Sequence, residues 1–288
     1  MGFDVTWHPI SQEEMFLWYF DRLEEARRGD YATAMSFAKQ YRMGKEAGYE
    51  DSCKQGYRGM LEQGAGIPPD APFDKTHSFL LAMVQGMFRT YYYTRGGIYS
   101  GLAEMDPHMA SYTLPFQDIL GPKLQNPVRN RIYENYCGGV YIPEKEVPRL
   151  LEDYESGKVE GPLRQCFGNT LPVFLKALLH AKKERLGLLE ATEVVEPNPM
   201  DLRSTNCRSY LMNCDMDGVM IYAETAKHQL EEAIRQSGGD PANVQVSRQV
   251  SQVVLPPDPT EEAPKPPSPP KEAAPKKKGF FSRLFGGN

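Results

Sequence analysis

The 288-residue sequence predicts an α+β protein that is predominantly α-helical, with a single globular body, a few short strands and then a disordered proline-rich tail. Three observations lead to this fold class. Residues 74–93 and 170–186 carry apolar side chains at helical spacing. Residues 3–7 alternate apolar and polar side chains with the period of a strand. Nine prolines fall within residues 251–276, where almost nothing can be buried.

Composition sets the limits of the predicted parts. Hydrophobic residues make up 40% of the chain and charged residues 25%, which are ordinary values for a folded domain. Paired glycines at 238 and 239 end the last predicted helix, and prolines dominate from there on. We therefore expect a mostly helical globular domain over residues 1–238, a disordered linker over residues 239–275 and a basic amphipathic peptide over residues 276–288.

The first elements follow from alternation and capping. The pattern of residues 3–7 predicts a half-buried strand that Pro9 ends, because proline lacks the N–H that a ladder needs. Ser11 and Glu14 have the spacing of a capping box, so we expect a helix to begin there and to stop near Gly29.

Three further helices are expected before the middle of the chain. Asp30 can cap the first of them, and the second covers residues 47–63 before a loop rich in glycine and proline. Residues 74–93 form the third and most buried one, because an apolar stripe runs along it and few charges interrupt its other faces. Four prolines between residues 98 and 135 then indicate short helices and loops.

The remaining elements complete a small sheet. Residues 138–142 predict a short strand, and Pro143 stands where the next helix would begin. Residues 170–186 predict a strong helix with Gly187 as its C-cap. The apolar run at residues 219–222 predicts a strand ahead of the last helix. The strands expected to meet in one sheet are residues 3–7, 140–142 and 219–222.

Net charge limits the class of partner. The chain carries −5, and the seven Lys or Arg against five Asp or Glu after Gly238 leave the body with −7. Broad binding of a phosphate backbone needs clustered cations, so nucleic acid is not expected as a partner. An acidic, aromatic-rich body favours a protein partner, and a basic one in particular.

Cysteine usage and the absence of long apolar runs indicate a compartment. Five scattered cysteines without CxxC spacing predict neither a disulfide framework nor a zinc site. Residues 1–9 lack the pattern of a secretory signal, and no apolar run reaches the ~18 residues of a membrane span. We expect a cytoplasmic protein that is at most peripheral to a membrane.

The most distinctive segment is the basic, phenylalanine-rich C-terminal peptide. If it is helical, its large apolar side chains share one face while its cations are free to meet anionic headgroups. We expect it to dock on a membrane, on a partner or on the body itself, with the proline-rich segment as a tether. The candidate docking residues are Lys276, Lys277, Lys278, Phe280, Phe281, Arg283, Leu284 and Phe285.

A second candidate site lies where the most buried predicted helix meets a loop. Tyrosines, an arginine and glycines concentrate over residues 91–99. Tyrosine with arginine is frequent at binding hot spots, and loops held by rigid elements often carry function. If a pocket exists there, we expect Tyr93, Arg95 or Tyr99 to line it.

A third candidate resembles a calcium loop over twelve residues only. Residues 213–224 nearly satisfy the EF-hand pattern of oxygen ligands, a central glycine and a final glutamate. Asn213 replaces the usual first aspartate and Ile221 offers no oxygen at position nine, which favours a turn leading into a strand. The other residues show no catalytic or metal-binding motif, and we expect no cofactor and no metal.

Together these features predict a non-catalytic interaction or accessory protein, of which a toxin-neutralising immunity protein is one form, with a tethered C-terminal docking peptide. The first alternative is an enzyme whose site assembles near the loop at residues 93–99. The second alternative is a calcium-responsive protein that acts through residues 213–224.

Overall fold

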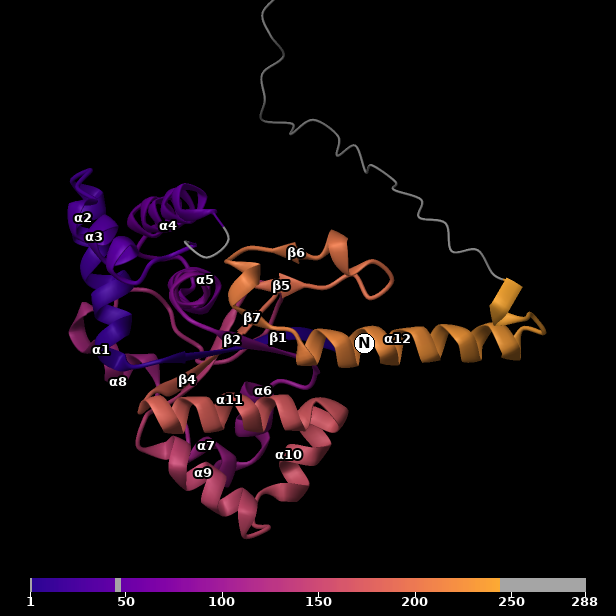
Figure 1. Ribbon diagram of the computed structural model, residues 1–288. Coiled ribbons are helices and arrows are strands. Elements are labelled where there is room, and N and C mark those ends of the chain that lie inside the picture. Colours follow the sequence, from indigo (N-terminus) through magenta and orange to yellow (C-terminus); the bar gives the residue numbers. More distant parts are fainter. Residues whose placement is uncertain (1, 45–47, 244–288) are drawn as a thin grey trace, which may run out of the picture. The chain divides into compact units, whose positions relative to one another are not determined.

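The structure, a computed structural model, describes residues 2–44 and 48–243. Helices surround a five-stranded mixed sheet, which confirms the predicted helix-rich α+β class (Figure 1). The strand order is β3-β4-β1-β2-β7; the first four strands pair antiparallel, and β7 runs parallel to β2. The strands are β1 (Phe3–Ile10), β2 (Tyr91–Gly96), β3 (Gly138–Ile142), β4 (Gly187–Thr192), β7 (Cys214–Asp215) and, in a separate two-stranded pair, β5 (Val195–Glu196) and β6 (Asn206–Cys207).

Two of the three predicted strands are present, and the third is wrong. β1 and β3 form where expected, but residues 219–222 lie inside helix α12 (Asp217–Gln236). The continuous apolar run there imitates a buried strand, whereas alanine, glutamate and lysine farther along continue the helix. The two-residue strands β5, β6 and β7 are not predicted. Two longer strands are also missed: β2 overlaps the end of an expected helix, and β4 follows an expected C-cap.

The helix boundaries explain both missed strands. α5 (His77–Phe88) ends at Arg89, whose backbone is extended, so the tyrosines that follow pair with β1 instead of continuing the helix. α11 (Leu171–Glu184) is capped by Arg185, which adopts the left-handed conformation with φ 58°. Gly187, the expected cap, is the first residue of β4 instead, where a β-carbon would collide with the Tyr141 side chain.

Two layers of helices enclose the sheet (Figure 1). The helices of the first layer, among them α5, pack in one hydrophobic core, and the helices of the second layer, among them α11, pack in another. The first layer comprises α1 (Gln12–Met15), the π-helix η1 (Phe16–Phe20), α2 (Asp21–Arg27), α3 (Ala32–Gln40), α4 (Glu50–Ala65), η3 (Phe73–Lys75), α5, α8 (Phe116–Leu120) and η4 (Gly121–Lys123). The second comprises α6 (Tyr99–Met105), α7 (Pro107–Ala110), α9 (Glu146–Glu155), α10 (Glu160–Phe167) and α11.

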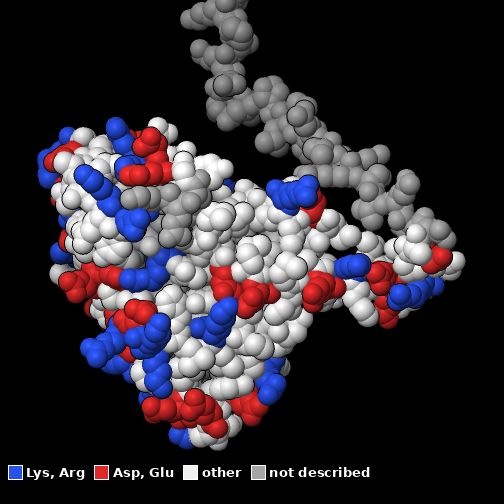
Figure 2. Space-filling model, viewed as in Figure 1, with Lys and Arg blue, Asp and Glu red and all other residues white. Residues whose placement is uncertain are grey.

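Surface charge is mixed in sign. On the face shown in Figure 2, Lys and Arg side chains alternate with Asp and Glu over both helical layers and along α12. The helices carry ion pairs three or four residues apart, such as Arg58 with Glu62 and Arg164 with Glu160. The acidic balance of the body is therefore spread out on this face and forms no single acidic patch.

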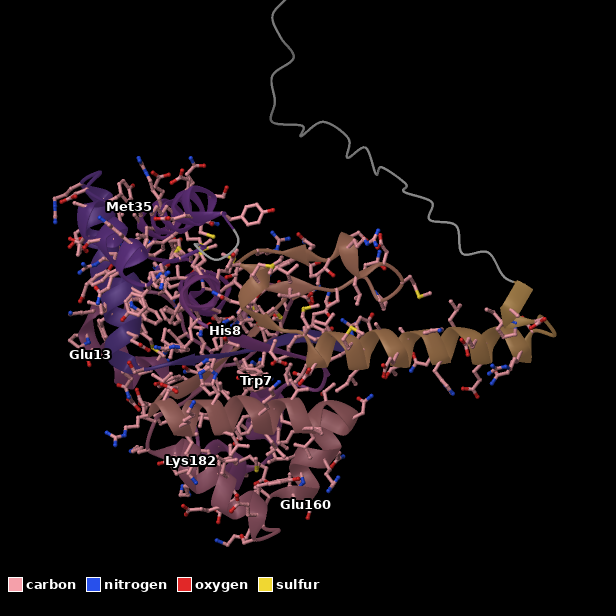
Figure 3. The ribbon with its side chains drawn as sticks, viewed as in Figure 1. Trp7, His8, Glu13, Met35, Glu160 and Lys182 are labelled. Carbon is pink, nitrogen blue, oxygen red and sulfur yellow. The ribbon has the colours of Figure 1, made fainter. Side chains whose placement is uncertain are left out.

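β1 is the central strand and is buried on both faces, whereas its alternation predicted a half-buried strand. Trp7 and His8 point into opposite layers (Figure 3): Trp7 packs on Phe174 of α11, and His8 bonds Gln85 of α5. Pro9 does not end the strand, which continues to Ile10. The Pro9 carbonyl lies on the side of β1 that faces β2, but it accepts from the Gln85 side chain at 3.0 Å and not from β2. The N and O of one strand residue point the same way, so the missing N–H of Pro9 faces a side where no strand pairs.

The polar side chains buried in β1 are satisfied by an ordered set of hydrogen bonds. Gln85 donates its amide N–H to the Pro9 carbonyl, so its oxygen is left to accept from Nδ1 of His8 at 2.7 Å. Nε2 of His8 then accepts from the Thr6 hydroxyl at 2.8 Å. Burial lowers the pKa of His8 to about 3, so the ring is neutral and serves as packing material stacked on Tyr91.

The last helix, α12, packs on β2 through its first two turns. Gly218 and Val219 are buried there, and a β-carbon at Gly218 would collide with the backbone of Tyr93. Within the described ranges of the chain, every helix is too short or too polar to cross a lipid bilayer.

Candidate functional site

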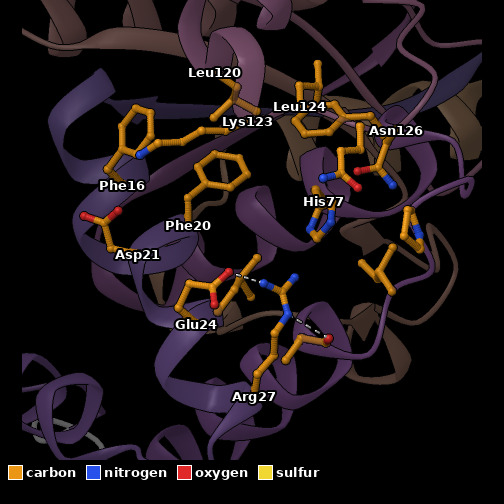
Figure 4. A pocket seen from close by; sticks show the side chains of 16 residues that line it. Phe16, Phe20, Asp21, Glu24, Arg27, His77, Leu120, Lys123, Leu124 and Asn126 are labelled. Atoms are coloured by element: carbon orange, nitrogen blue, oxygen red, sulfur yellow. Dashed lines mark hydrogen bonds and ion pairs between the residues drawn. The ribbon is translucent and has the colours of Figure 1, made fainter.

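A cavity of about 730 Å³ opens in the first helical layer. It lies between the η1–α2 segment, the end of α4, the start of α5 and the residues around η4 (Figure 4). This volume falls within the roughly 300–1,000 Å³ of ordinary ligand sites. Two further cavities, of about 440 Å³ beside α12 and about 410 Å³ beside α6, are smaller.

Aromatic rings form one wall of this cavity. Phe20 and Phe73 lie nearly parallel with ring centroids 6.2 Å apart, and His77 lies 5.9 Å from Phe73. Phe73 is fully buried and Phe20 is half-buried, so the wall has a fixed inner ring and an outer ring that can meet a ligand. Flat apolar groups stack well on such a surface.

The wide turn of η1 decides which of its aromatic side chains face the cavity. η1 is a π-helix directly after the capping box at Ser11 and Glu14, whose reciprocal hydrogen bonds confirm the predicted helix start. Trp18 and Tyr19 point into the core, while Phe16 and Phe20 line the cavity. π-Helical turns are rare and are often found at functional sites.

His77 is held by Tyr19 behind the wall. The Tyr19 hydroxyl lies 2.8 Å from Nδ1 of His77, and Gly64 leaves room for it, because a β-carbon there would come within 2.5 Å of that hydroxyl. Burial lowers the pKa of His77 to about 4, and the nearby Arg27 charge lowers it further in the same direction. The imidazole is therefore neutral at physiological pH.

Charged side chains form the rim. Arg27 donates to Glu24 and, at 3.4 Å, to the carbonyl of Ala65 at the end of α4 (Figure 4). The Lys123 ammonium lies 5.5 Å from the centroid of the Phe16 ring, a cation–π contact. Asp21 is exposed at the same rim. Both signs of charge are thus available around an apolar interior.

Tyr93 and Arg95, two of the three predicted pocket residues, meet at Asp4. Both bond the Asp4 carboxylate, and Glu193 lies on the other side of Asp4 with a left-handed φ of 59°. Burial and then the Asp4 charge raise the pKa of Glu193 to about 7. The Arg95 guanidinium lies 4.8 Å from the ring centroid of Tyr222, so this cluster ties the sheet to α12.

Tyr99, the third predicted residue, lies in the opposite layer. It is fully buried in the core shared with α11, and its hydroxyl donates to the Met109 carbonyl at 3.1 Å. The three cavities named above, all within the described ranges, are lined by neither Tyr93 nor Arg95 nor Tyr99.

The residues of the calcium-like loop have other partners. Lys176 donates to Asp215 at 2.6 Å and to Asp217 at 2.7 Å. Asn213 donates to backbone carbonyls at the end of α5, and Glu224 lies on the second turn of α12. Among the described residues, no group of three or more His, Cys, Asp or Glu side chains is placed to hold a metal ion.

The C-terminal docking residues, over 276–288, lie outside the described part of the chain. Sequence reasoning missed the cavity because its walls come from segments more than 100 residues apart, between Phe16 and Asn126. One signal was available: four of the five residues 16–20 are aromatic, more than one face of a helix can bury.

Comparison with family models, curated proteins and solved structures finds no match to this chain. Function must therefore be argued from the site itself.

Proposed function

We propose that this chain is a non-catalytic interaction protein whose cavity in the first helical layer captures an aromatic side chain of a protein partner. The observation that carries the proposal is the aromatic wall of Phe20, Phe73 and His77 inside a cavity with a charged rim. Aromatic anchors in desolvated pockets supply most of the binding energy of many interfaces. The rim supplies polar contacts for the backbone around such an anchor.

The chemistry of the lining favours binding over catalysis. His77 is oriented by a tyrosine hydroxyl and not by a carboxylate, and the described lining residues include no serine, threonine or cysteine as a nucleophile. The catalytic alternative near residues 93–99 has less support, because the carboxylates beside Tyr93 and Arg95, Asp4 and Glu193, line none of the three cavities.

The mixed surface charge bears on the expected partner. An acidic body predicted a basic partner, but in Figure 2 the two signs are interleaved. Shape and apolar contact at the cavity are therefore the stronger basis for recognition, with rim charges such as Asp21 and Lys123 adding specificity.

A cavity-filling variant tests this proposal. Ala65→Trp places a ring where Ala65 lines the cavity, while Ala32→Trp adds the same ring to an exposed position of α3. A partner captured from the native source and then purified should bind the wild type and Ala32→Trp equally, and Ala65→Trp at least ten-fold more weakly in calorimetry. Equal binding by all three folded proteins would refute a role for the cavity.

We further propose, from the sequence, that residues 276–288 dock the protein on an anionic membrane or on a partner and so hold it at its place of action in the cytoplasm. Three lysines, an arginine and four large apolar side chains suit weak, reversible docking. In flotation with phosphatidylserine vesicles, the full chain should rise with the vesicles, and a chain that ends at residue 275 should stay in the unbound fraction. Equal flotation of both would exclude the membrane version.

A further inference from the structure

The hydrogen bond between Tyr19 and His77 fixes which imidazole nitrogen carries the proton. The Tyr19 hydroxyl is fully buried and has no second partner in the described ranges. A buried hydroxyl proton without an acceptor destabilises the fold, so Tyr19 donates and Nδ1 accepts. A neutral imidazole that accepts at Nδ1 carries its proton on Nε2.

The Nε2 proton is available to a ligand. His77 lines the cavity, and among the described residues no group bonds its Nε2. The donor thus stands at the edge of an aromatic wall and not on the open surface, since His77 is only 8% exposed. A ring stacked on Phe20 would bring its substituents toward this donor.

An acceptor lines the same cavity. Asn126 donates its amide N–H groups to the carbonyls of Pro68, at 3.2 Å, and Ala71, at 2.8 Å. These two bonds fix the amide so that its oxygen is the free end, with no donor bonded to it within the described ranges. His77 and Asn126 therefore offer one donor and one acceptor to the group that fills the cavity (Figure 4).

We propose that the aromatic side chain captured by the cavity is a tyrosine, whose phenol oxygen accepts from Nε2–H of His77 and whose hydroxyl proton goes to the oxygen of Asn126. This inference rests on the proposed function and names the chemistry of the partner's anchor. Among the side chains of phenylalanine, tyrosine and tryptophan, only the phenol of tyrosine both accepts and donates at its tip.

The same groups reject the other aromatic side chains. A phenylalanine would displace water from Nε2–H of His77 and leave that donor unpaired. An indole offers only a donor, so its N–H would face the Nε2–H of His77 and provide no acceptor for it. Sites built to bond a hydroxyl discriminate strongly against the analogue that lacks it, because the buried polar groups of the site lose their partner. We expect a preference for tyrosine of at least ten-fold.

Three matched probes test this preference on the full chain. N-acetyl-tyrosinamide, N-acetyl-phenylalaninamide and N-acetyl-tryptophanamide are titrated separately while the methyl NMR signals of Leu23, Ile67 and Leu120, which line the cavity, are followed. The tyrosine amide should shift these signals with a Kd at least ten-fold below those of the other two. The comparison uses the wild type alone and so needs no variant to fold.

Variants then locate the discriminating group. His77→Phe keeps a ring in the wall but removes the donor and leaves the Asn126 acceptor, so the preference for the tyrosine amide over the phenylalanine amide should fall several-fold. His228→Phe, at an exposed position of α12, is the matched control and should keep the preference. Equal Kd values in the wild type, or a preference that is unchanged in His77→Phe, would overturn the inference and leave a cavity that binds aromatic rings without selecting tyrosine. If no amide shifts the methyl signals, both the inference and the proposed function fail.

Discussion

Glu190 provides the sharpest test of the energetics of this fold. Its side chain is fully buried on β4, and its carboxylate accepts the backbone N–H groups of Tyr99 at 2.5 Å and Ser100 at 3.1 Å, which begin α6, and of Val140 at 3.3 Å on β3. One carboxyl group thus joins two strands to the first turn of a helix. Burial raises its pKa from 4.5 to about 7, against the opposing effect of these hydrogen bonds.

The raised pKa makes stability depend on pH with a definite sign. Between pH 4.5 and about 7 the folded state keeps the Glu190 proton while the unfolded chain has released it. The contribution to stability is therefore complete below pH 4.5 and is lost as pH rises through 7. A shift of this size corresponds to about 3 kcal/mol at ~1.4 kcal/mol for each pKa unit.

Glu190→Gln isolates this contribution, because glutamine keeps the shape and does not titrate. The buried histidines, among them His8 and His77, have lowered pKa values and change stability in the opposite direction over an overlapping range. They are present in both proteins and cancel when the variant is compared with the wild type at each pH. The comparison is made by urea unfolding, with Glu155→Gln, exposed at the end of α9, as the control.

The free energy of unfolding of the wild type minus that of Glu190→Gln should fall by about 3 kcal/mol between pH 4.5 and pH 8. The same difference for Glu155→Gln should stay constant. If the wild-type and Glu190→Gln profiles run parallel, the three N–H donors and the helix start hold the carboxylate ionised in the folded state, and the argument from burial is wrong.

Two further predictions concern packing and pairing. Gly187→Ala should lower the free energy of unfolding by about 2 kcal/mol, because a β-carbon would overlap the Tyr141 ring packed on it from β3. Gly161→Ala, in open space on α10, is the control and should be neutral or stabilising. Equal urea midpoints for the two variants would contradict this prediction. Glu14→Gln should lower the free energy of unfolding by about 1–3 kcal/mol, because Arg89 donates to both oxygens of the Glu14 carboxylate, at 2.9 Å and 2.7 Å. Glu62→Gln removes one partner of an exposed ion pair and should change Tm little. Similar losses of Tm in the two variants would count against the prediction.

Much of the helical part could be predicted because it depends on neighbouring residues. The capping box at Ser11 and Glu14 and the apolar stripe of α11 are local patterns, and both helices form near the expected positions. Residues 138–142 likewise form β3 as expected. These signals need no knowledge of what lies opposite in space.

Strand pairing could not be predicted from the same patterns. The tyrosines of β2 follow an apolar helix without interruption, and only the ladder with β1, which sets Tyr93 opposite Thr6, makes them a strand. Residues 219–222 show the converse, because a local apolar run suggested a strand where a helix begins, with Gly218 packed closely on Tyr93.

The sequence by itself determined the fold class, the positions of the main helices and the existence of a proline-rich, basic C-terminal segment, because composition and short-range periodicity carry that information. Only the tertiary structure decided that β1 is buried on both faces, that Glu190 bonds the start of α6, and that Phe20 and His77 share a cavity. Those facts depend on contacts between segments separated by tens to more than a hundred residues, and no local pattern records which distant segments meet.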